Sequence, residues 1–240
     1  MDELQSHNLK EIAARYAVHH FLQPGMNIGL GSGSTAAFAV SALAERIRSE
    51  KLPVGALVAT SAETARLASF QGIEVLPDLD AAGVWLDVTI DGADEVDPAL
   101  NLIKGGGGAL LREKLVAARS KAEIIVVDAS KVVASLGRTH PLPVMIVPYG
   151  WRTTAERIEA RLGRPGVLRR TQTGEIFVSD DGLYCLDIAV GPLPAPPALE
   201  RELKSIIGVV ESGLFTHCAK AVVVAETDGS VRVMENAGLQ

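Results

Sequence analysis

The sequence comprises 240 residues, of which 48% are hydrophobic, and its formal net charge is −6 at pH 7. The apolar content excludes an intrinsically disordered chain, because enough apolar surface is present to form a sizeable core. The net negative charge argues against nucleic acid as the main partner, since nucleic-acid-binding proteins usually carry a basic face.

Helices and strands alternate over the first 130 residues. The periodicity predicts helices at 4–21, 36–49 and 109–118, and another that follows Ser61 and runs to Gln71. Short strands are expected at 26–30, 54–58, Val75, 84–90 and 124–127, the last two as buried strands. Such alternation predicts an α/β fold with a parallel sheet covered by helices on both faces.

The pattern changes after Lys131. A strand at 144–147, a helix at 153–162, strands at 167–170, 176–178 and 184–189, and a helix at 198–206 indicate a compact α+β module. The segments 221–225 and 231–234 flank Asp228-Gly229 and predict a hairpin that rejoins the first domain. We therefore expect one domain at 1–137 and 214–240, and a small α+β domain at 138–213.

The N-terminal segment lacks the pattern of a signal peptide, and no apolar run approaches the roughly 18 residues that span a membrane. The two cysteines, Cys185 and Cys218, lie far apart and form no CxxC pair, which excludes a disulfide framework and a cysteine-rich zinc site. We expect a cytoplasmic protein with neither a membrane nor a nucleic acid as partner.

Polar loops follow four of the predicted strands. They read GSGST, TSAET, DGADEVD and DASK. In open parallel sheets, ligands bind outside the carboxyl ends of the strands. We therefore expect these loops to converge on one site.

The first glycine-rich loop joins a strand to a helix and contains Ser32, Gly33, Ser34 and Thr35. Free N–H groups and the positive dipole end at a helix N-terminus suit a phosphate group. A dinucleotide site is not favoured, because the third glycine of GxGxxG is absent and no acidic residue stands at the end of the next strand, about 20 residues on. No GK[ST] follows, so a P-loop is not favoured, and an ordinary strand–helix turn remains the alternative.

The second glycine-rich loop, Lys104 followed by four glycines, leads into the predicted helix at 109–118. Consecutive glycines lose much conformational entropy on folding, so a flexible linker is one interpretation. The other is a helix N-terminus whose exposed N–H groups, beside a lysine, stabilise a negative oxygen as an oxyanion hole does.

Carboxylates flank this second loop. Asp91 and Asp94 follow a buried strand, in a stretch that a solvated acidic turn or a divalent metal site would also explain. The five histidines show no regular ligand spacing, so we expect no metal site. Glu113 lies near the start of the next helix, where most glutamates are surface residues favoured by the helix dipole. The two glycine loops and the two aspartates favour a chemical role for it.

At this point the sequence strongly resembles the A-type ribose-5-phosphate isomerase family. The matching motifs are GLGSGSTA, DGADEVDPALNLIKGGGGALLREKLVA, DASKVV, PLPVMIVP and VVESGLF, and they cover nearly the whole chain in the family's order. The resemblance implies a Rossmann-like parallel-sheet domain with a smaller ferredoxin-like α+β domain inserted before the C-terminal hairpin. It also implies interconversion of D-ribose 5-phosphate and D-ribulose 5-phosphate in the non-oxidative pentose phosphate pathway.

The resemblance further implies the site residues. Glu113 falls on the catalytic base, and Asp91, Asp94 and Lys104 are assigned to catalysis with it. The implied substrate-binding residues are Ser32, Gly33, Ser34, Thr35, Asp91, Gly92, Ala93, Asp94, Lys104, Gly105, Gly106, Gly107 and Lys131. The family uses no cofactor, binds a small sugar phosphate, and usually forms homodimers or homotetramers.

The chain departs from the family pattern at a few positions. Met145 replaces a glutamate, Ser212 replaces an asparagine, and Lys10-Glu11 stands where the family has a lysine pair. Three other functions compete with the isomerase: a sugar-phosphate sensor without catalysis, an acyl-CoA transferase relative and a nicotinamide-dependent enzyme. A sensor should lack the base and usually carries a DNA-binding motif, a transferase needs a surface for CoA, and the nicotinamide fingerprint is incomplete.

Overall fold

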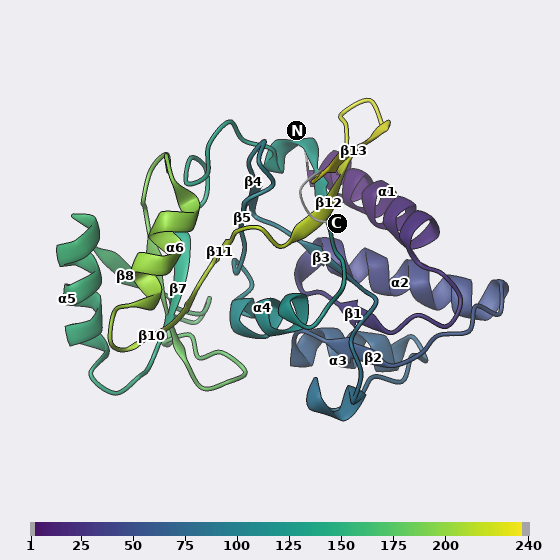
Figure 1. Cartoon of the computed structure of the whole chain (residues 1–240), viewed down its shortest axis with the longest axis horizontal. Helices are drawn as coiled ribbons and strands as arrows, with labels where there is room; N and C mark the ends of the chain where they lie inside the picture. The colour runs from purple at the N-terminus through teal and green to yellow at the C-terminus, as the bar shows by residue number, and fades with distance from the viewer. Residues whose placement is uncertain (1–2, 237–240) are drawn as a thin grey trace. The chain divides into compact units, whose positions relative to one another are not determined.

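The computed structural model describes residues 3–236 and divides into two compact units, and most of their helices and strands are labelled in Figure 1. Unit 1 comprises residues 3–93, 112–131 and 218–236, and unit 2 comprises residues 94–111 and 132–217. Residues 94–111 group with unit 2, whereas the sequence pattern predicts them in the first domain. The predicted domain limits stay a prediction.

In the described residues, unit 1 contains a six-stranded sheet in the order β13-β12-β6-β3-β1-β2. All neighbouring strands are parallel except β12 and β13, which form the predicted antiparallel hairpin. The strands are β1 (Ile28–Leu30), β2 (Leu57–Ala59), β3 (Val88–Gly92), β6 (Glu123–Asp128), β12 (Ala219–Ala225) and β13 (Val231–Glu235). The helices of this unit are α1 (Glu3–Phe21), α2 (Gly33–Ser49), α3 (Ala62–Phe70), η1 (Asp80–Ala82), η2 (Ala129–Lys131) and α4 (Leu110–Ala118) from Arg112 onward.

Apolar side chains bury both faces of this sheet. On one face, Ile28, Ile90 and Ile124 pack with α1 and α2, and on the other, Val58 packs with Val116 of α4. A parallel sheet covered on both faces is the arrangement that near-continuous apolar strands require. The predicted α/β fold with a Rossmann-like parallel sheet is confirmed.

Unit 2 is an α+β structure. Its described residues form a four-stranded antiparallel sheet in the order β10-β7-β9-β8 and a three-stranded sheet in the order β11-β5-β4. The elements are β4 (Glu95–Val96), β5 (Leu102–Ile103), β7 (Leu142–Ile146), α5 (Trp151–Leu162), β8 (Gly166–Leu168), β9 (Tyr184–Ile188), α6 (Pro196–Lys204), β10 (Val209–Ser212) and β11 (Leu214–Phe215). Val144, Ile158 and Leu203 belong to its core, so strand and helix faces are buried together. The prediction of a smaller α+β module is confirmed.

Several predicted strands differ from the structure. Val75 lies in no strand, and β3 begins at Val88 instead of 84 because Trp85 is 52% exposed and only Leu86 bridges to Ser120. The segment 176–178 forms isolated bridges only. The short strands β4, β5, β10 and β11 were not predicted, since two to four residues carry too little alternation to reveal a strand.

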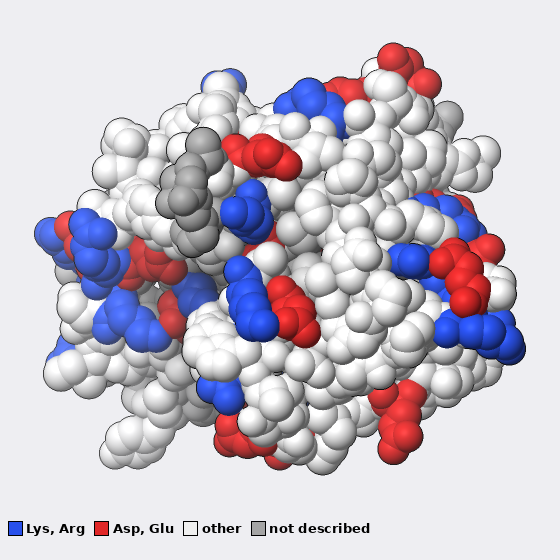
Figure 2. Space-filling view, turned by 45° about the vertical axis from the view of Figure 1, so that its right-hand side comes forward, with Lys and Arg blue, Asp and Glu red and all other residues white. Residues whose placement is uncertain are grey.

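Charged side chains of both signs are interspersed on the face drawn in Figure 2. Exposed ion pairs among the described residues include Arg15 with Glu45 at 2.6 Å and Lys121 with Asp87 at 2.7 Å. Exposed pairs of this kind contribute little to stability. In the part of the chain that the structure describes, no helix is both long and apolar enough to cross a membrane.

A buried carboxylate in unit 2 organises the start of β7. Glu95 is fully buried and accepts hydrogen bonds from the backbone N–H groups of Gly137, Thr139 and His140 and from the Thr139 hydroxyl. Burial raises the pKa of Glu95, but these hydrogen bonds together bring the pKa below its ordinary value of 4.5. The ionised carboxylate therefore ties the 137–140 loop to β4.

Replacing Glu95 with glutamine should lower the free energy of unfolding by about 1–3 kcal/mol at pH 7, because the new amide group faces N–H donors. A lowered folded-state pKa gives stability that is present above the unfolded value and lost as pH falls through the folded one. The gap between wild type and Glu95→Gln should thus be constant at neutral pH and shrink below about pH 4.5. Urea titrations at several pH values measure this difference in the free energy of unfolding. Glu156→Gln, at an exposed position on α5, is the control. A gap that widens in acid would contradict the assignment.

Candidate active site

The predicted loops of unit 1 meet at the carboxyl ends of its parallel strands. After β1, the Ser32 N–H donates to Asp91 Oδ1 at 3.0 Å, and the hydroxyls of Ser32 and Thr60 are 2.5 Å apart. The GSGST, TSAET and DGADEVD loops are therefore in contact, as their positions after neighbouring strands predicted. Thr60 was not among the predicted site residues, although its place after β2 was the available signal.

The GSGST loop fits tightly against β3. Gly31 is required there, because a Cβ added to it would lie 2.5 Å from the Asp91 Cα atom. Ser32 is the N-cap of α2, and its hydroxyl contacts Thr60 instead of capping the helix. Gly33 and Ser34 are exposed. The loop thus presents a helix N-terminus and hydroxyl groups to solvent, which is a geometry that suits an anion.

Lys10 reaches this loop from α1. Its ammonium group donates to the Ser34 hydroxyl at 3.0 Å. The shift in sequence register relative to the family's lysine pair therefore does not keep Lys10 away from the GSGST loop. A positive charge beside the hydroxyls strengthens the attraction for an anion at this helix end.

Asp91 is fully buried at the end of β3. Its Oδ1 atom accepts hydrogen bonds from the N–H groups of Ser32 at 3.0 Å and Gly92 at 2.7 Å. Hydrogen bonds to a charged acceptor are stronger than neutral ones. Asp91 therefore holds the GSGST loop and its own turn together, in addition to any role in chemistry.

Glu113 lies in the first turn of α4 and is only 4% exposed. It therefore is not one of the surface glutamates that are common at this position of a helix. Val116, one turn later, is also buried, so both lie on the buried side of α4. Burying a carboxylate is costly, and such residues are concentrated at functional sites.

The second glycine-rich loop belongs to unit 2. Lys104 is 2% exposed, with its ammonium 5.4 Å from the centroid of the Phe215 ring. The Gly106 N–H donates to Asp94 Oδ2 at 2.8 Å, and the Gly108 N–H donates to the Gly105 carbonyl at 2.9 Å. The glycine run is therefore an ordered turn and not a flexible linker.

Two acids of the DGADEVD stretch, Glu95 and Asp97, have structural roles. Glu95 ties down the 137–140 loop, and Asp97 Oδ1 accepts hydrogen bonds from the backbone N–H groups of Ala99 and Asn101, both at 2.9 Å. These two acids shape the backbone and are not part of a solvated acidic turn. Within the described residues, no group of three or more His, Cys, Asp or Glu side chains is placed to hold a metal ion.

The predicted site residues thus fall in two sets. Unit 1 carries Ser32, Gly33, Ser34, Thr35, Asp91, Gly92, Ala93, Glu113 and Lys131, the last half-buried in η2 after β6. Unit 2 carries Asp94, Lys104, Gly105, Gly106 and Gly107. Direct hydrogen bonds join Ser32 to Asp91 in the first set and Asp94 to Gly106 in the second.

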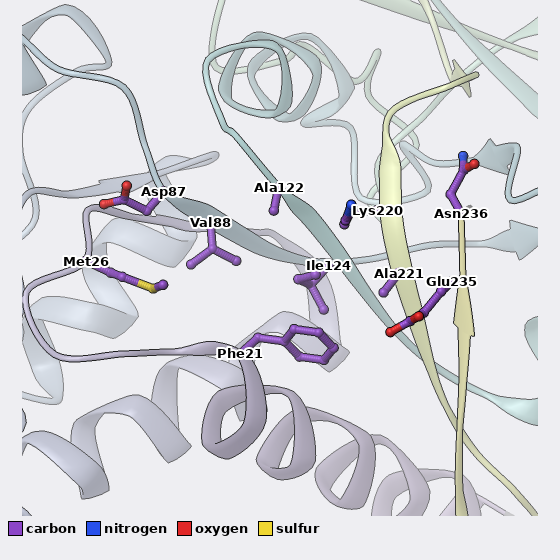
Figure 3. Close-up of a pocket in the computed structure, with 10 residues that line it drawn as sticks. All are labelled: Phe21, Met26, Asp87, Val88, Ala122, Ile124, Lys220, Ala221, Glu235 and Asn236. Carbon is purple, nitrogen blue, oxygen red and sulfur yellow. The ribbon is translucent and has the colours of Figure 1, made fainter. Parts of the chain in front are cut away.

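A cavity of about 450 Å³ lies at the other end of the unit 1 strands, where the parallel strands β3 and β6 begin (Figure 3). Its lining includes Phe21 at the end of α1 and Val88 and Ile124 near the starts of their strands. None of the predicted site residues lines it. This cavity is therefore separate from the loops at the carboxyl ends of the strands.

Comparisons with known proteins agree over nearly the whole chain. The family described as ribose 5-phosphate isomerase A (phosphoriboisomerase A) matches residues 56–229. A curated relative from Gloeobacter violaceus, named ribose-5-phosphate isomerase A, is 52% identical over 94% of this chain and 95% of its own length.

Solved structures give the same result. Ribose 5-phosphate isomerase from Plasmodium falciparum is 35% identical with a TM-score of 0.91, covering 96% of this chain and 99% of that one. A D-ribose-5-phosphate isomerase in complex with phospho-erythronic acid is 34% identical with a TM-score of 0.91, covering 98% of this chain and 100% of that one.

Proposed function

Because the chain belongs to the ribose 5-phosphate isomerase A family, we infer that it interconverts D-ribose 5-phosphate and D-ribulose 5-phosphate through a cis-enediol. The observation that carries this inference is the 52% identity over 94% of the chain, together with the retained carboxylates and glycine loops. The reaction places the enzyme in the non-oxidative pentose phosphate pathway. The complex of a relative with phospho-erythronic acid supports a phosphorylated open-chain sugar as the ligand.

The competing functions are not favoured. A sensor without catalysis would not need the buried Glu113, which this chain retains. The relatives that match the chain from end to end are named as isomerases, not as acyl-CoA transferases or nicotinamide-dependent enzymes. The chain is an aldose–ketose isomerase.

The reaction needs one base that serves two carbons. Moving the carbonyl from C1 to C2 requires that the proton on C2 be removed and a proton be returned to C1. One carboxylate placed over both carbons does this through the enediol, and we assign the role to Glu113. Its burial supports the assignment, since buried carboxylates are concentrated at functional sites.

The oxygens need a separate set of groups. Asp91 is assigned to acid–base work at the oxygens and Asp94 to holding sugar hydroxyls. Lys104 and the glycine N–H groups would stabilise the negative charge of the enediolate, which is usually the larger contribution to catalysis. Because the Gly106 N–H donates to Asp94, the aspartate also orients the turn that carries these donors.

The phosphate is assigned to the Ser32–Thr35 loop and Lys131. The exposed Gly33 and Ser34 at the start of α2 support this assignment, and Lys10 beside Ser34 adds a further positive charge. Binding the remote phosphate holds a flexible sugar in reactive geometry, so its binding energy is used at the reacting carbons.

Two variants of Asp91 should distinguish its structural role from its chemical role. Asp91→Asn keeps an oxygen that accepts from Ser32 and Gly92 but removes the charge, so we expect an intact fold and a kcat about 10²–10⁴-fold lower. Asp91→Ala also loses both hydrogen bonds, each worth about 1.5–3 kcal/mol, and should melt at a lower temperature. Steady-state kinetics and thermal melting distinguish them. If both variants lose stability equally, the charge itself is structural.

One assay tests the function directly. Purified protein should convert ribose 5-phosphate to ribulose 5-phosphate, and EDTA should leave the rate unchanged because no step requires a metal. In D₂O, solvent deuterium should enter the product at the carbon that receives the proton. Failure to convert ribose 5-phosphate with or without added divalent metal ions would refute the proposal.

The assembly and location are further parts of the proposal. We expect a homodimer or homotetramer, as the family resemblance implies, and a location in the cytoplasm. Size-exclusion chromatography with light scattering measures the mass of the assembly, and a mass of one chain at micromolar concentration would contradict it.

A further inference from the structure

The geometry points to Arg169 as a positioning residue for the isomerase reaction, which holds the second glycine-rich loop in the shape that its oxyanion donors require. Arg169 immediately follows β8 and is distant in sequence from Gly105 and Gly106. Neither the motifs nor the family resemblance marked it. The inference rests on the proposed function and adds a residue that acts on the loop without touching substrate.

Arg169 is hydrogen-bonded to both the loop and its own sheet. One terminal nitrogen, Nη1, donates to the carbonyls of Gly105 at 2.8 Å and Gly106 at 3.1 Å. The other side of the guanidinium donates to the two carboxylate oxygens of Asp187 on β9, with Nε at 2.9 Å from Oδ2. This bidentate pair fixes the plane of the guanidinium, and the hydrogen bonds from Nη1 then fix the orientation of the Gly105 and Gly106 carbonyls.

These contacts orient the peptide groups. In a trans peptide, the N–H points opposite to the carbonyl. The Gly105 carbonyl faces Arg169 and the Gly106 N–H faces Asp94, so this peptide is held from both sides. The next peptide has its Gly106 carbonyl on Arg169, which directs the Gly107 N–H away from the guanidinium. Arg169 thus sets the direction of a donor in a loop of glycines, which have little conformational preference of their own.

The support for Arg169 is itself rigid. Its side chain is 13% exposed, its N–H donates to the Cys185 carbonyl at 2.8 Å, and its carbonyl accepts from Phe177 at 3.0 Å. The Phe177 ring lies against Gly108, where an added Cβ would be 2.2 Å from the ring. Burial lowers the pKa of Arg169, but the hydrogen bond to Asp187 and neighbouring charges, including Asp94, raise it overall. The guanidinium therefore stays charged.

Arg169→Lys is the informative variant. An ammonium group retains the charge but cannot hydrogen-bond Asp187 and both carbonyls at once with the planar geometry of a guanidinium. The next residue supplies a matched control: Arg170 is exposed and donates to the Gly174 carbonyl in a hairpin turn. We expect Arg169→Lys to lower kcat by about 10–100-fold, part of the effect of losing an oxyanion donor, with KM changed by less than about threefold. Arg170→Lys should leave both within about twofold of wild type.

Two further measurements separate positioning from general stability. Affinity for phospho-erythronic acid, a carboxylate probe, should fall in Arg169→Lys, whereas affinity for inorganic phosphate should not. Asp187→Asn should also lower kcat. The kcat of the double variant should be little lower than that of either single variant, because the two residues act as one unit. If Arg169→Lys lowers only the melting temperature and leaves kcat and KM unchanged, the inference is overturned.

A readout without activity distinguishes this inference from the proposed function. In protein labelled with ¹⁵N-glycine, the amide resonances of Gly106 and Gly107 should shift or broaden in Arg169→Lys and remain unchanged in Arg170→Lys. Unchanged Gly106 and Gly107 resonances in Arg169→Lys would overturn the inference even if the wild type is an active isomerase. If the wild type fails to convert ribose 5-phosphate, the proposed function fails, and a role for Arg169 in that reaction fails with it.

Discussion

Glu113→Gln should lower kcat for ribose 5-phosphate by about 10²–10⁴-fold while KM changes little. Glutamine has nearly the shape of glutamate, so it fills the same buried position on α4 and preserves substrate binding. It cannot accept the C2 proton, so the step that forms the enediol is lost. A fall in kcat without a change in KM identifies an interaction made only in the transition state.

Isotope exchange checks the same substitution independently. Wild-type enzyme should place solvent deuterium on the sugar in D₂O, and Glu113→Gln should lose this exchange in parallel with turnover. The control is Glu123→Gln, which makes the same change at a buried glutamate at the start of β6. Its kcat should stay near that of wild type at a temperature where it is folded. Near-normal turnover by Glu113→Gln would remove Glu113 as the base.

Lys104→Met should lower kcat by about 10²–10³-fold, the size of effect that follows from losing one oxyanion donor. Methionine keeps a flexible apolar stem in a position that is only 2% exposed, and it can still pack against Phe215. The positive charge that would stabilise the enediolate is absent. Binding of phospho-erythronic acid should weaken together with kcat, because its carboxylate resembles that charge.

The exposed Lys121 provides the matched control for this variant. It pairs with Asp87 near the start of β3, and Lys121→Met should change neither kcat nor the affinity for the analogue. Isothermal titration calorimetry measures the affinity of both variants for phospho-erythronic acid, and steady-state assays measure their kcat and KM. If Lys104→Met retains kcat but raises KM, Lys104 binds substrate without stabilising the transition state.

How far the site could be predicted depends on whether a residue acts through its neighbours in sequence. Asp91 and Ser32 were predictable because each follows a strand of one parallel sheet, and such positions meet at one edge. Within DGADEVD, however, Asp91 and Glu95 have the same local character. Only the folded chain shows that Glu95 is occupied by the N–H groups of Gly137, Thr139 and His140, far along the chain.

By itself, the sequence determined the parallel α/β sheet, the smaller α+β unit, the two glycine-rich loops and the family. These depend on local periodicity, on glycine at tight turns and on long contiguous motifs, all of which can be read along the chain. Only the tertiary structure decided that Glu113 is buried, that Lys10 reaches Ser34, and that Arg169 holds Gly105 and Gly106. The reason is physical: burial and hydrogen bonds between distant residues depend on how elements pack, and no local pattern encodes which side chain will fill a given space.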